Sequence, residues 1–215
     1  MTDYARIRAD LRAAYGPAGA RQRDRQSKPD WKQAERAAFL LRLRQERCLS
    51  LLEIGAGTGQ DSVFFAAAGL EVTATDMSPA MVAACRAKGL RAVVMDFGTP
   101  VFAAESFDAV HAMNCLLHVP NADLPRTLSA VCRLLRPGGL FFFGGYGGTG
   151  EEGTLGGDDH VPPRFFSWRT DEQILGFARQ HFEVLDFHVV GLGPERHRFQ
   201  SLTLRRPRAG QRVPD

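Results

Sequence analysis

The chain has 215 residues, of which 44% are hydrophobic, and a formal net charge of only +3. It is long enough for one domain with a sizeable core, and so small a charge argues against nucleic acid as a partner. No apolar run approaches the ~20 residues that cross a bilayer, and the N-terminus MTDYARIRAD lacks the apolar segment of a signal peptide, so a cytoplasmic protein with no membrane partner is expected.

Residues 1–48 are expected to form a helical cap or lid. The stretch DYARIRADLRAAY places Tyr4, Ile7, Leu11 and Tyr15 on one face of an amphipathic helix that ends at GPAGA. The basic cluster RQRDRQSK follows and is interpreted as a solvated loop. A second helix, PDWKQAERAAFLLRLRQ, carries Trp31 on its apolar face.

From residue 49 onward, short apolar strands alternate with helices. The strands are CLSLLEI, LEVTATD, RAVVMDF, FDAVHAMN and LFFFGGY, and the intervening helices include SPAMVAACRAKG and DLPRTLSAVCRLLRPGG. This alternation predicts an α/β protein with a doubly wound, mostly parallel sheet over residues 49–206.

The C-terminal third continues this domain. A glycine-dense loop at 144–157 opens a segment, 144–169, that is expected to act as a flap, and the helix TDEQILGFARQHF follows it. EVLDFHVVGL and RFQSLTLRRP, joined by GPERH, predict a terminal antiparallel strand pair. Residues 207–215 are expected to be a flexible tail, and the basic cluster LRRPRAGQR is interpreted as solvated.

Cysteine usage indicates neither a disulfide framework nor a zinc site. Cys48, Cys85, Cys115 and Cys132 are widely spaced and form no C-x-x-C pair. Asp158, Asp159 and His160 are too weak a set to predict a metal, so no metal is expected.

The stretch LLEIGAGTGQDS places Gly55, Gly57 and Gly59 directly after the first strand. The dinucleotide fingerprint G-x-G-x-x-G fails in both registers, because Gln60 or Ser62 stands where the third glycine belongs. Glu53 would also oppose a nearby phosphate. The loop therefore permits close approach of a ligand, but not of a pyrophosphate.

Three further polar residues follow strands, where ligands of doubly wound sheets bind. Asp76 can accept hydrogen bonds from ribose hydroxyls, and Asp96, beside Phe97, from an exocyclic amine. Asn114 can bind a carboxylate or an ammonium group, although ordinary turn or cap roles remain open for all three.

These stretches, together with LLRPGGLFFF, resemble the class I S-adenosylmethionine-dependent methyltransferases over residues 48–145. The resemblance implies a Rossmann-like, seven-stranded sheet with a terminal antiparallel pair. It implies S-adenosylmethionine as cofactor and S-adenosylhomocysteine as product. The cofactor-binding residues that it implies are Glu53, Gly55, Ala56, Gly57, Gly59, Asp76, Met77, Asp96, Phe97 and Asn114.

Catalytic and substrate residues are less defined. His118 is the best candidate for a general base, with a structural role as an equal alternative, and His160 is a second candidate; His111, His181, His188 and His197 are interpreted as structural. The segments that vary within the family supply the candidate substrate residues. These are Tyr4, Tyr15, Trp31, His118, Tyr146, Phe165 and Phe166, with Trp168 nearby.

The sequence thus predicts methyl transfer to an oxygen or nitrogen of a small molecule by a monomer or homodimer. A peptide or an RNA base as acceptor remains an alternative, as does a relative that binds the cofactor without catalysis. An NAD-type oxidoreductase is disfavoured by the failed fingerprint.

Overall fold

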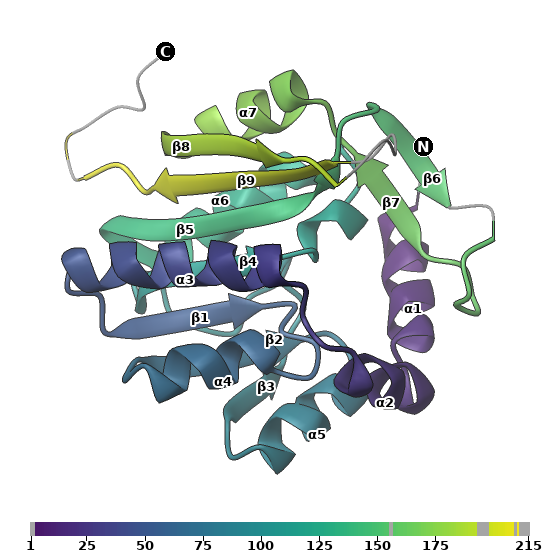
Figure 1. Cartoon of the computed structure of the whole chain (residues 1–215). Coiled ribbons are helices and arrows are strands. Elements are labelled where there is room, and N and C mark those ends of the chain that lie inside the picture. Colours follow the sequence, from purple (N-terminus) through teal and green to yellow (C-terminus); the bar gives the residue numbers. More distant parts are fainter. Residues whose placement is uncertain (1–2, 155–156, 193–197, 209, 211–215) are drawn as a thin grey trace.

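The fold is seen in a computed structural model that describes residues 3–154, 157–192, 198–208 and 210 (Figure 1). Within these residues, no helix combines the length and the hydropathy that a bilayer crossing requires. The GPERH turn with His197, residues 155–156 of the expected flap, and most of the expected tail lie outside the described part of the chain.

A seven-stranded sheet in the order β3–β2–β1–β4–β5–β9–β8 forms the centre of the molecule. The first five strands are parallel, whereas β9 runs antiparallel to both β5 and β8. This topology confirms the predicted doubly wound sheet with its terminal antiparallel pair. The strands are β1 (Ser50–Ile54), β2 (Glu71–Asp76), β3 (Arg91–Val94), β4 (Phe107–Met113), β5 (Leu135–Gly147), β8 (Glu183–Val190) and β9 (Arg198–Arg205).

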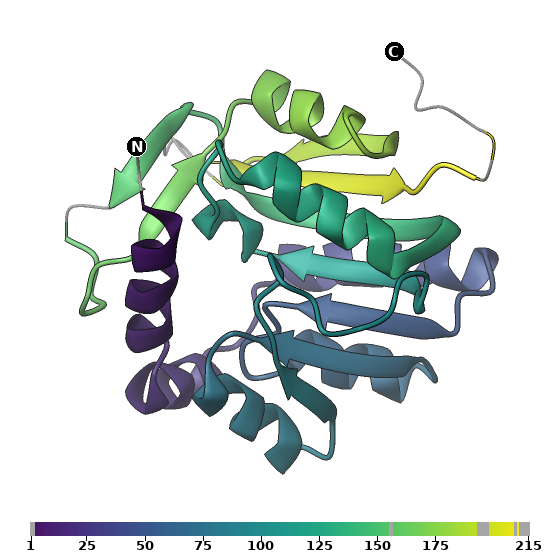
Figure 2. The same cartoon turned by 180° about the vertical axis from the view of Figure 1, so that it is seen from behind.

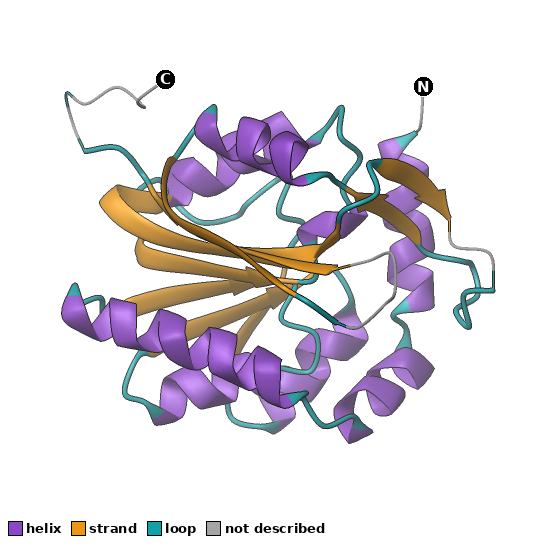
Figure 3. Ribbon diagram, turned by 45° about the horizontal axis from the view of Figure 1, so that its top comes forward, coloured by secondary structure: helices purple, strands orange, loops and turns teal. Residues whose placement is uncertain are grey.

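Helices cover both faces of the sheet (Figure 3). Because successive side chains of a strand point to opposite faces, Leu51 packs with α3 (Asp30–Gln45) and α4 (Gln60–Ala67), while Leu52 packs with α6 (Leu124–Leu134) and α7 (Asp171–Arg179). Helix α5 (Pro79–Ala87) contacts β2 and β3, and Figure 2 shows α6 and α7 on the opposite face. Strands buried on both faces explain the unbroken apolar runs in the sequence.

The N-terminal 48 residues divide between two locations. Helices α1 (Tyr4–Ala14) and α2 (Pro17–Arg25) lie across the carboxyl ends of the parallel strands (Figure 1), where a cap would lie. Helix α3 instead forms part of the layer on the sheet, because Phe39, Leu40 and Leu43 pack against Leu51 and Phe142. These three residues therefore belong to the core, whereas the expected apolar face does not, since Trp31 is only partly buried and Leu41 is 59% exposed.

The glycine-dense segment 144–157 is largely strand, which differs from the expected loop. Strand β5 continues through Gly147, and β6 (Glu151–Thr154) pairs with β7 (Phe165–Trp168) in a separate antiparallel sheet. A Cβ on Gly144 would lie 2.5 Å from the Phe199 ring, and one on Gly147 would collide with the Gln200 side chain. These glycines reflect close packing of β9 on β5, which sequence cannot distinguish from a need for flexibility.

The basic clusters are not simply solvated. Arg205 ends β9 and forms two 2.7 Å bonds with Glu46, and Arg206 pairs with Glu105 at 2.9 Å. The N-terminal cluster RQRDRQSK lies in α2 and the linker to α3, beside the carboxyl edge of the sheet. Its side chains contribute to the site described next.

Candidate functional site

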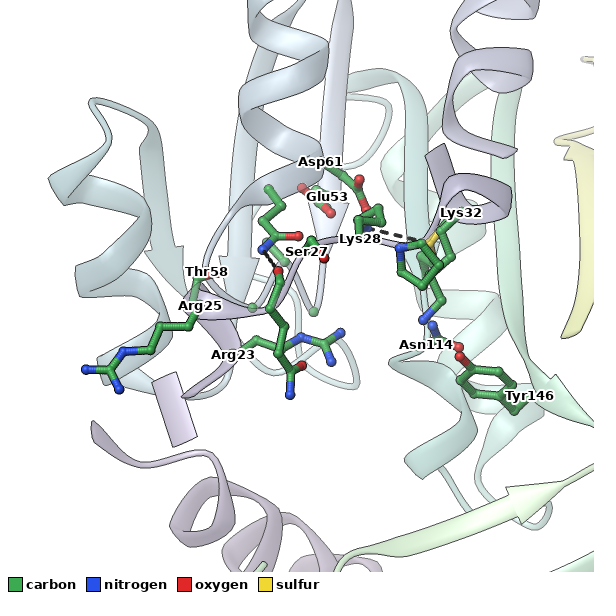
Figure 4. A pocket seen from close by; sticks show the side chains of 17 residues that line it. Arg23, Arg25, Ser27, Lys28, Lys32, Glu53, Thr58, Asp61, Asn114 and Tyr146 are labelled. Carbon is green, nitrogen blue, oxygen red and sulfur yellow. Dashed lines mark hydrogen bonds and ion pairs between the residues drawn. The ribbon is translucent and has the colours of Figure 1, made fainter. Parts of the chain in front are cut away.

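Two adjoining cavities open at the carboxyl edge of the parallel strands. The larger has a volume of about 560 Å³ and lies between the glycine loop and the linker before α3 (Figure 4); the smaller, about 70 Å³, lies between the glycine loop and α1. The two meet, since they share Arg23, Gly55, Gly57, Met113 and Asn114. The arrangement can hold one elongated molecule across both cavities and a second molecule in the larger one.

The three glycines of the loop have different functions. All have positive φ, but a Cβ on Gly55 would collide with Cys115, and one on Gly59 would lie 2.7 Å from Leu90, so both are required by packing. Gly57, with φ +56°, faces space in which a Cβ would meet no atom within 4 Å. Gly57 is therefore the glycine of the loop that leaves room for a ligand, and Ala56 lines the larger cavity beside it.

Asp76, at the end of β2, lies on the smaller cavity. One carboxylate oxygen accepts from the Gly57 N–H and the other from the Ser78 N–H, both at 2.9 Å. Burial raises the pKa of this carboxyl to about 6. A carboxylate offers about four acceptor positions, so two remain for hydroxyl groups of a ligand.

Apolar side chains line the smaller cavity together with Asp76. Met77, Met81 and Phe97 all line it, which suits apolar contact with a planar ring. Asp96 does not line this cavity. Its carboxylate accepts a 2.6 Å bond from Arg8 of α1 and a 2.8 Å bond from the Gly98 N–H. Asp96 therefore fastens α1 to the edge of the sheet.

Glu53 is buried at the end of β1 and supports the loop from beneath. It accepts a hydrogen bond from Ser62 at the start of α4, and its other oxygen lies 3.5 Å from His111 Nδ1. Glu53, Asp61 and His111 form a cluster in which one potential metal-ligand atom of each residue lies within 4.8 Å of those of the other two. Asp61 is already bonded by Lys28 and Arg36, so protein cations occupy the positions around it that a metal would need.

Asn114, at the end of β4, lies where the two cavities meet. Its φ is +57°, an uncommon conformation for a side-chain-bearing residue, and its N–H donates to Gly144 O at 2.8 Å. Its side-chain oxygen is buried and lacks a hydrogen-bond partner among the described residues. Since buried polar atoms are nearly always paired, this oxygen is available to accept a hydrogen bond from a ligand.

His118 lies on the smaller cavity in a short 3₁₀ turn (Leu116–His118), but its ring nitrogens are occupied. Nδ1 lies 2.7 Å from Phe165 O, and Nε2 lies 3.0 Å from the hydroxyl of Tyr15. Because a carbonyl oxygen can only accept, Nδ1 carries the proton of the neutral ring, and Nε2 accepts from the Tyr15 hydroxyl, which also accepts from Arg164 at 3.1 Å. Burial lowers the pKa of His118 to about 4, which makes it a weak base.

The other residues that the sequence suggested for substrate binding divide into two groups. Tyr15 lines the smaller cavity and Tyr146 the larger. Trp31 packs against Phe199 at a ring separation of 4.7 Å, Phe165 packs with α1, and Phe166 stacks on Trp168.

Two further candidates do not line either cavity. Tyr4 is half-buried against the core. His160 lies beside Asp158, which Arg164 binds through three donors.

The larger cavity contains charged residues that sequence reasoning missed. Arg23, Arg25, Lys28, Lys32 and Asp61 all line it (Figure 4). The available signal was the cluster RQRDRQSK directly before a helix, which is typical of a solvated loop as well. Only the packing of α3 on the sheet brings this linker to the glycine loop.

These residues fit S-adenosylmethionine. Asp76 has acceptor capacity for two ribose hydroxyls, Met77 and Phe97 can enclose an adenine ring, and Gly57 and the free Asn114 oxygen can contact the amino-acid end. The cationic side chains of the larger cavity can pair with its carboxylate. No phosphate needs to be accommodated near Glu53.

Comparisons with known proteins agree with this fit. Residues 51–139 match the family model of the methyltransferase domain. Ubiquinone biosynthesis O-methyltransferases of Xanthomonas oryzae and Methylobacterium nodulans are 40% and 37% identical over 99 and 100 residues, which are 43% and 44% of this chain. The match spans only about two fifths of those relatives' length (41% and 39%).

Solved structures match over more of the chain. A Burkholderia thailandensis 1,6-didemethyltoxoflavin N1-methyltransferase with bound S-adenosylhomocysteine has a TM-score of 0.73 and 21% identity, covering 96% of this chain and 92% of the other. The [4+2]-cyclase SpnF has a TM-score of 0.61 and 21% identity, covering 75% and 76%. At such identities the likeness establishes the fold alone. In its matched segment, its strand order and a site that fits the cofactor, the chain is similar to the class I S-adenosylmethionine-dependent methyltransferases.

Proposed function

We propose that this protein transfers the methyl group of S-adenosylmethionine to an oxygen or nitrogen of a small molecule. The observation that carries the proposal is the junction of the two cavities at Gly57 and Asn114. The smaller cavity has the acceptor and the apolar walls for a nucleoside. The larger, at about 560 Å³, has room for the amino-acid end and for an acceptor molecule.

The residues of this chain would act mainly by binding and alignment. When bound, the cofactor supplies a methyl group on a cationic sulfur, which a nucleophile can take directly. Asp76 and the glycine loop would fix the nucleoside, and Asn114 would orient the amino-acid end. Leu11 and Tyr15 of the α1 region cover the smaller cavity and exclude water from it.

A general base is not required of His118 in this proposal. Its Nε2 already accepts from Tyr15, and its lowered pKa, about 4, leaves it little basicity. Its role would be to position Tyr15 at the cavity wall. An acceptor that ionises readily, such as a phenol or an acid, would need no strong base.

A small acceptor is favoured by the shape of the site and by the relatives. The cavities lie between the glycine loop, α1 and the linker before α3, and the volume of the larger, about 560 Å³, suits a small molecule. The curated relatives are named as ubiquinone biosynthesis O-methyltransferases, and the solved neighbour acts on 1,6-didemethyltoxoflavin.

Titration calorimetry with S-adenosylhomocysteine and with NAD tests the cofactor. S-adenosylhomocysteine should bind and NAD should not. Transfer of a labelled methyl group into an extract of small metabolites then tests the activity. Binding of NAD alone would refute the proposal.

A second candidate is a protein that binds the cofactor without transferring its methyl group. It is considered because the same fold occurs in SpnF, a structure described as a [4+2]-cyclase, which is an activity other than methyl transfer. The two candidates separate on the labelling experiment. Tight S-adenosylhomocysteine binding with no labelled product from any extract would favour the second.

A further inference from the structure

The side chain of Lys32 is an ammonium group without a counter-ion. The residue is only 9% exposed, and the group points into the larger cavity toward Asn114 and Tyr146 (Figure 4). Among the described residues, no carboxylate lies within 4.0 Å of it and no side chain hydrogen-bonds to it. A buried charge is normally paired, so its isolation calls for a ligand.

Two aromatic rings hold the ammonium in place. Lys32 Nζ lies 4.9 Å from the centre of the Tyr146 ring and 5.1 Å from that of Trp31. Such contacts favour the charged form, but they do not supply a hydrogen-bond acceptor. The ammonium is therefore positioned and still has donors available.

Its surroundings disfavour a cation. Lys32 lies in the first turn of α3, where the helix dipole is positive, and Pro29 at the N-cap provides no side-chain acceptor. Burial and then the charges of Arg23 and Lys28 lower the pKa of Lys32 to about 8, and Asp61 opposes this only in part. Structural stability alone does not explain a lysine at this position.

The larger cavity has more positive than negative charge. Arg23, Arg25, Lys28 and Lys32 line it, against the carboxylates of Glu53 and Asp61. Asp61 is already shared by Lys28 and Arg36. S-adenosylmethionine carries a sulfonium and an ammonium against one carboxylate, so it would add positive charge to the cavity.

Lys32 is also not needed for the carboxylate of the cofactor. Arg23 lines both cavities, where the cofactor would extend from one to the other. No carboxylate among the described residues lies within 4.0 Å of the Arg23 guanidinium. A cation is thus available at the cofactor position, apart from Lys32.

We propose that the methyl acceptor is a small organic acid whose carboxylate binds the Lys32 ammonium beside Tyr146. This rests on the function proposed above and adds the class of acceptor. The apolar side chain of Met113 and the Tyr146 ring would contact the body of the acid. Lys32 is then a determinant of acceptor specificity.

Matched pairs of probes test this proposal: benzoate with benzamide, and salicylate with salicylamide. Their affinities are measured by calorimetry on the whole chain, with and without saturating S-adenosylhomocysteine. The acids should bind about tenfold more tightly than the amides. Lys32→Met should abolish that preference, whereas Arg44→Met, which removes an exposed cation of the same helix, should retain it.

Three results would overturn the proposal. The first is no preference for the acids in the unmodified protein. The second is an unchanged preference for the acids in Lys32→Met, with unchanged affinity for S-adenosylhomocysteine. The third is an unchanged preference together with a tenfold loss of S-adenosylhomocysteine affinity, which would assign Lys32 to the cofactor. Thermal unfolding verifies that Lys32→Met is folded, and Lys32→Gln provides a polar replacement if it is not.

Failure of the proposed function gives a different pattern. In that case S-adenosylhomocysteine would not bind to the unmodified protein. The preference for acids over amides, measured without S-adenosylhomocysteine, would still show whether Lys32 binds a carboxylate.

Discussion

At the scale of single residues, Asp76 holds the glycine loop and presents its remaining acceptor capacity to the smaller cavity. We expect Asp76→Asn to lower the affinity for S-adenosylhomocysteine by about 10- to 100-fold, or roughly 1–3 kcal/mol, because an amide replaces one acceptor oxygen with a donor. Calorimetry measures the change. Asp10→Asn, at an exposed position of α1, is the control, and equal affinities in the two variants would exclude Asp76 from the site.

The same carboxyl predicts a pH dependence. Its pKa in the free protein is raised to about 6 by burial, and two hydroxyl donors require the ionised form. Affinity should therefore be constant above pH 7 and fall as the pH drops below 6, by about tenfold at pH 5.

His118, with a pKa of about 4, does not titrate in this interval. S-adenosylhomocysteine titrations between pH 5 and pH 8 test the expectation. Asp76→Asn should give a flat profile. A steep profile in that variant would show that another group is responsible.

At the scale of elements, α1 covers the smaller cavity and is held by few contacts. Ile7 and Leu11 pack on Met77 and Phe165, and Arg8 pairs with Asp96 at 2.6 Å. Leu11 and its partner Met77 also line the smaller cavity. The docking of α1 and cofactor binding should therefore be coupled.

Leu11→Ala tests that coupling. Removing this buried side chain should weaken the docking of α1 by about 3 kcal/mol and reduce S-adenosylhomocysteine affinity, because Leu11 also lines the cavity. Amide exchange should accelerate in residues 4–14 but not in the sheet. Arg12→Ala, on the exposed face, should change neither, and unaltered exchange in Leu11→Ala would contradict the assignment.

At the scale of the whole molecule, the cofactor connects elements that are distant in the sequence. The two cavities are lined by α1, the linker before α3, the glycine loop and the ends of β2, β4 and β5. A ligand that binds only when these are assembled stabilises the folded state by mass action.

S-adenosylhomocysteine at about 100 times its Kd should stabilise the fold by about 2.7 kcal/mol. For a domain of this size, each kcal/mol raises the midpoint of thermal unfolding by about 2–4 °C, so the midpoint should shift upward by about 5–11 °C. NAD at the same concentration should give no shift. Equal shifts from both compounds would contradict the identification of the cofactor.

Much of the fold followed from local sequence patterns. Alternating apolar strands and capped helices predicted the parallel sheet, since side-chain periodicity reports directly on burial. The segment 144–157 was misjudged, because glycine in a strand and glycine in a loop have the same appearance in a sequence. The close approach of Phe199 to Gly144 depends on a strand more than fifty residues away.

The candidate site shows the same division. Glycine spacing, with acids at the ends of β1 and β2, was sufficient to indicate a cofactor without phosphate, because these features depend on short-range chemistry. The position of Asp96 after the third strand predicted a contact with the ligand. Its ion pair with Arg8 forms only because α1 crosses the edge of the sheet, which the sequence did not indicate. His118 was a plausible base until Tyr15 was found on its Nε2.

By itself, then, the sequence determined the class of fold and the chemistry of the cofactor loop, since both are encoded in contiguous residues. The tertiary structure decided which side chains are free to act. Lys32, in an ordinary helix start, became an unpaired cation only when α3 packed on the sheet and burial removed water from its ammonium group. Burial and pairing are properties of the assembled molecule, and no local pattern specifies them.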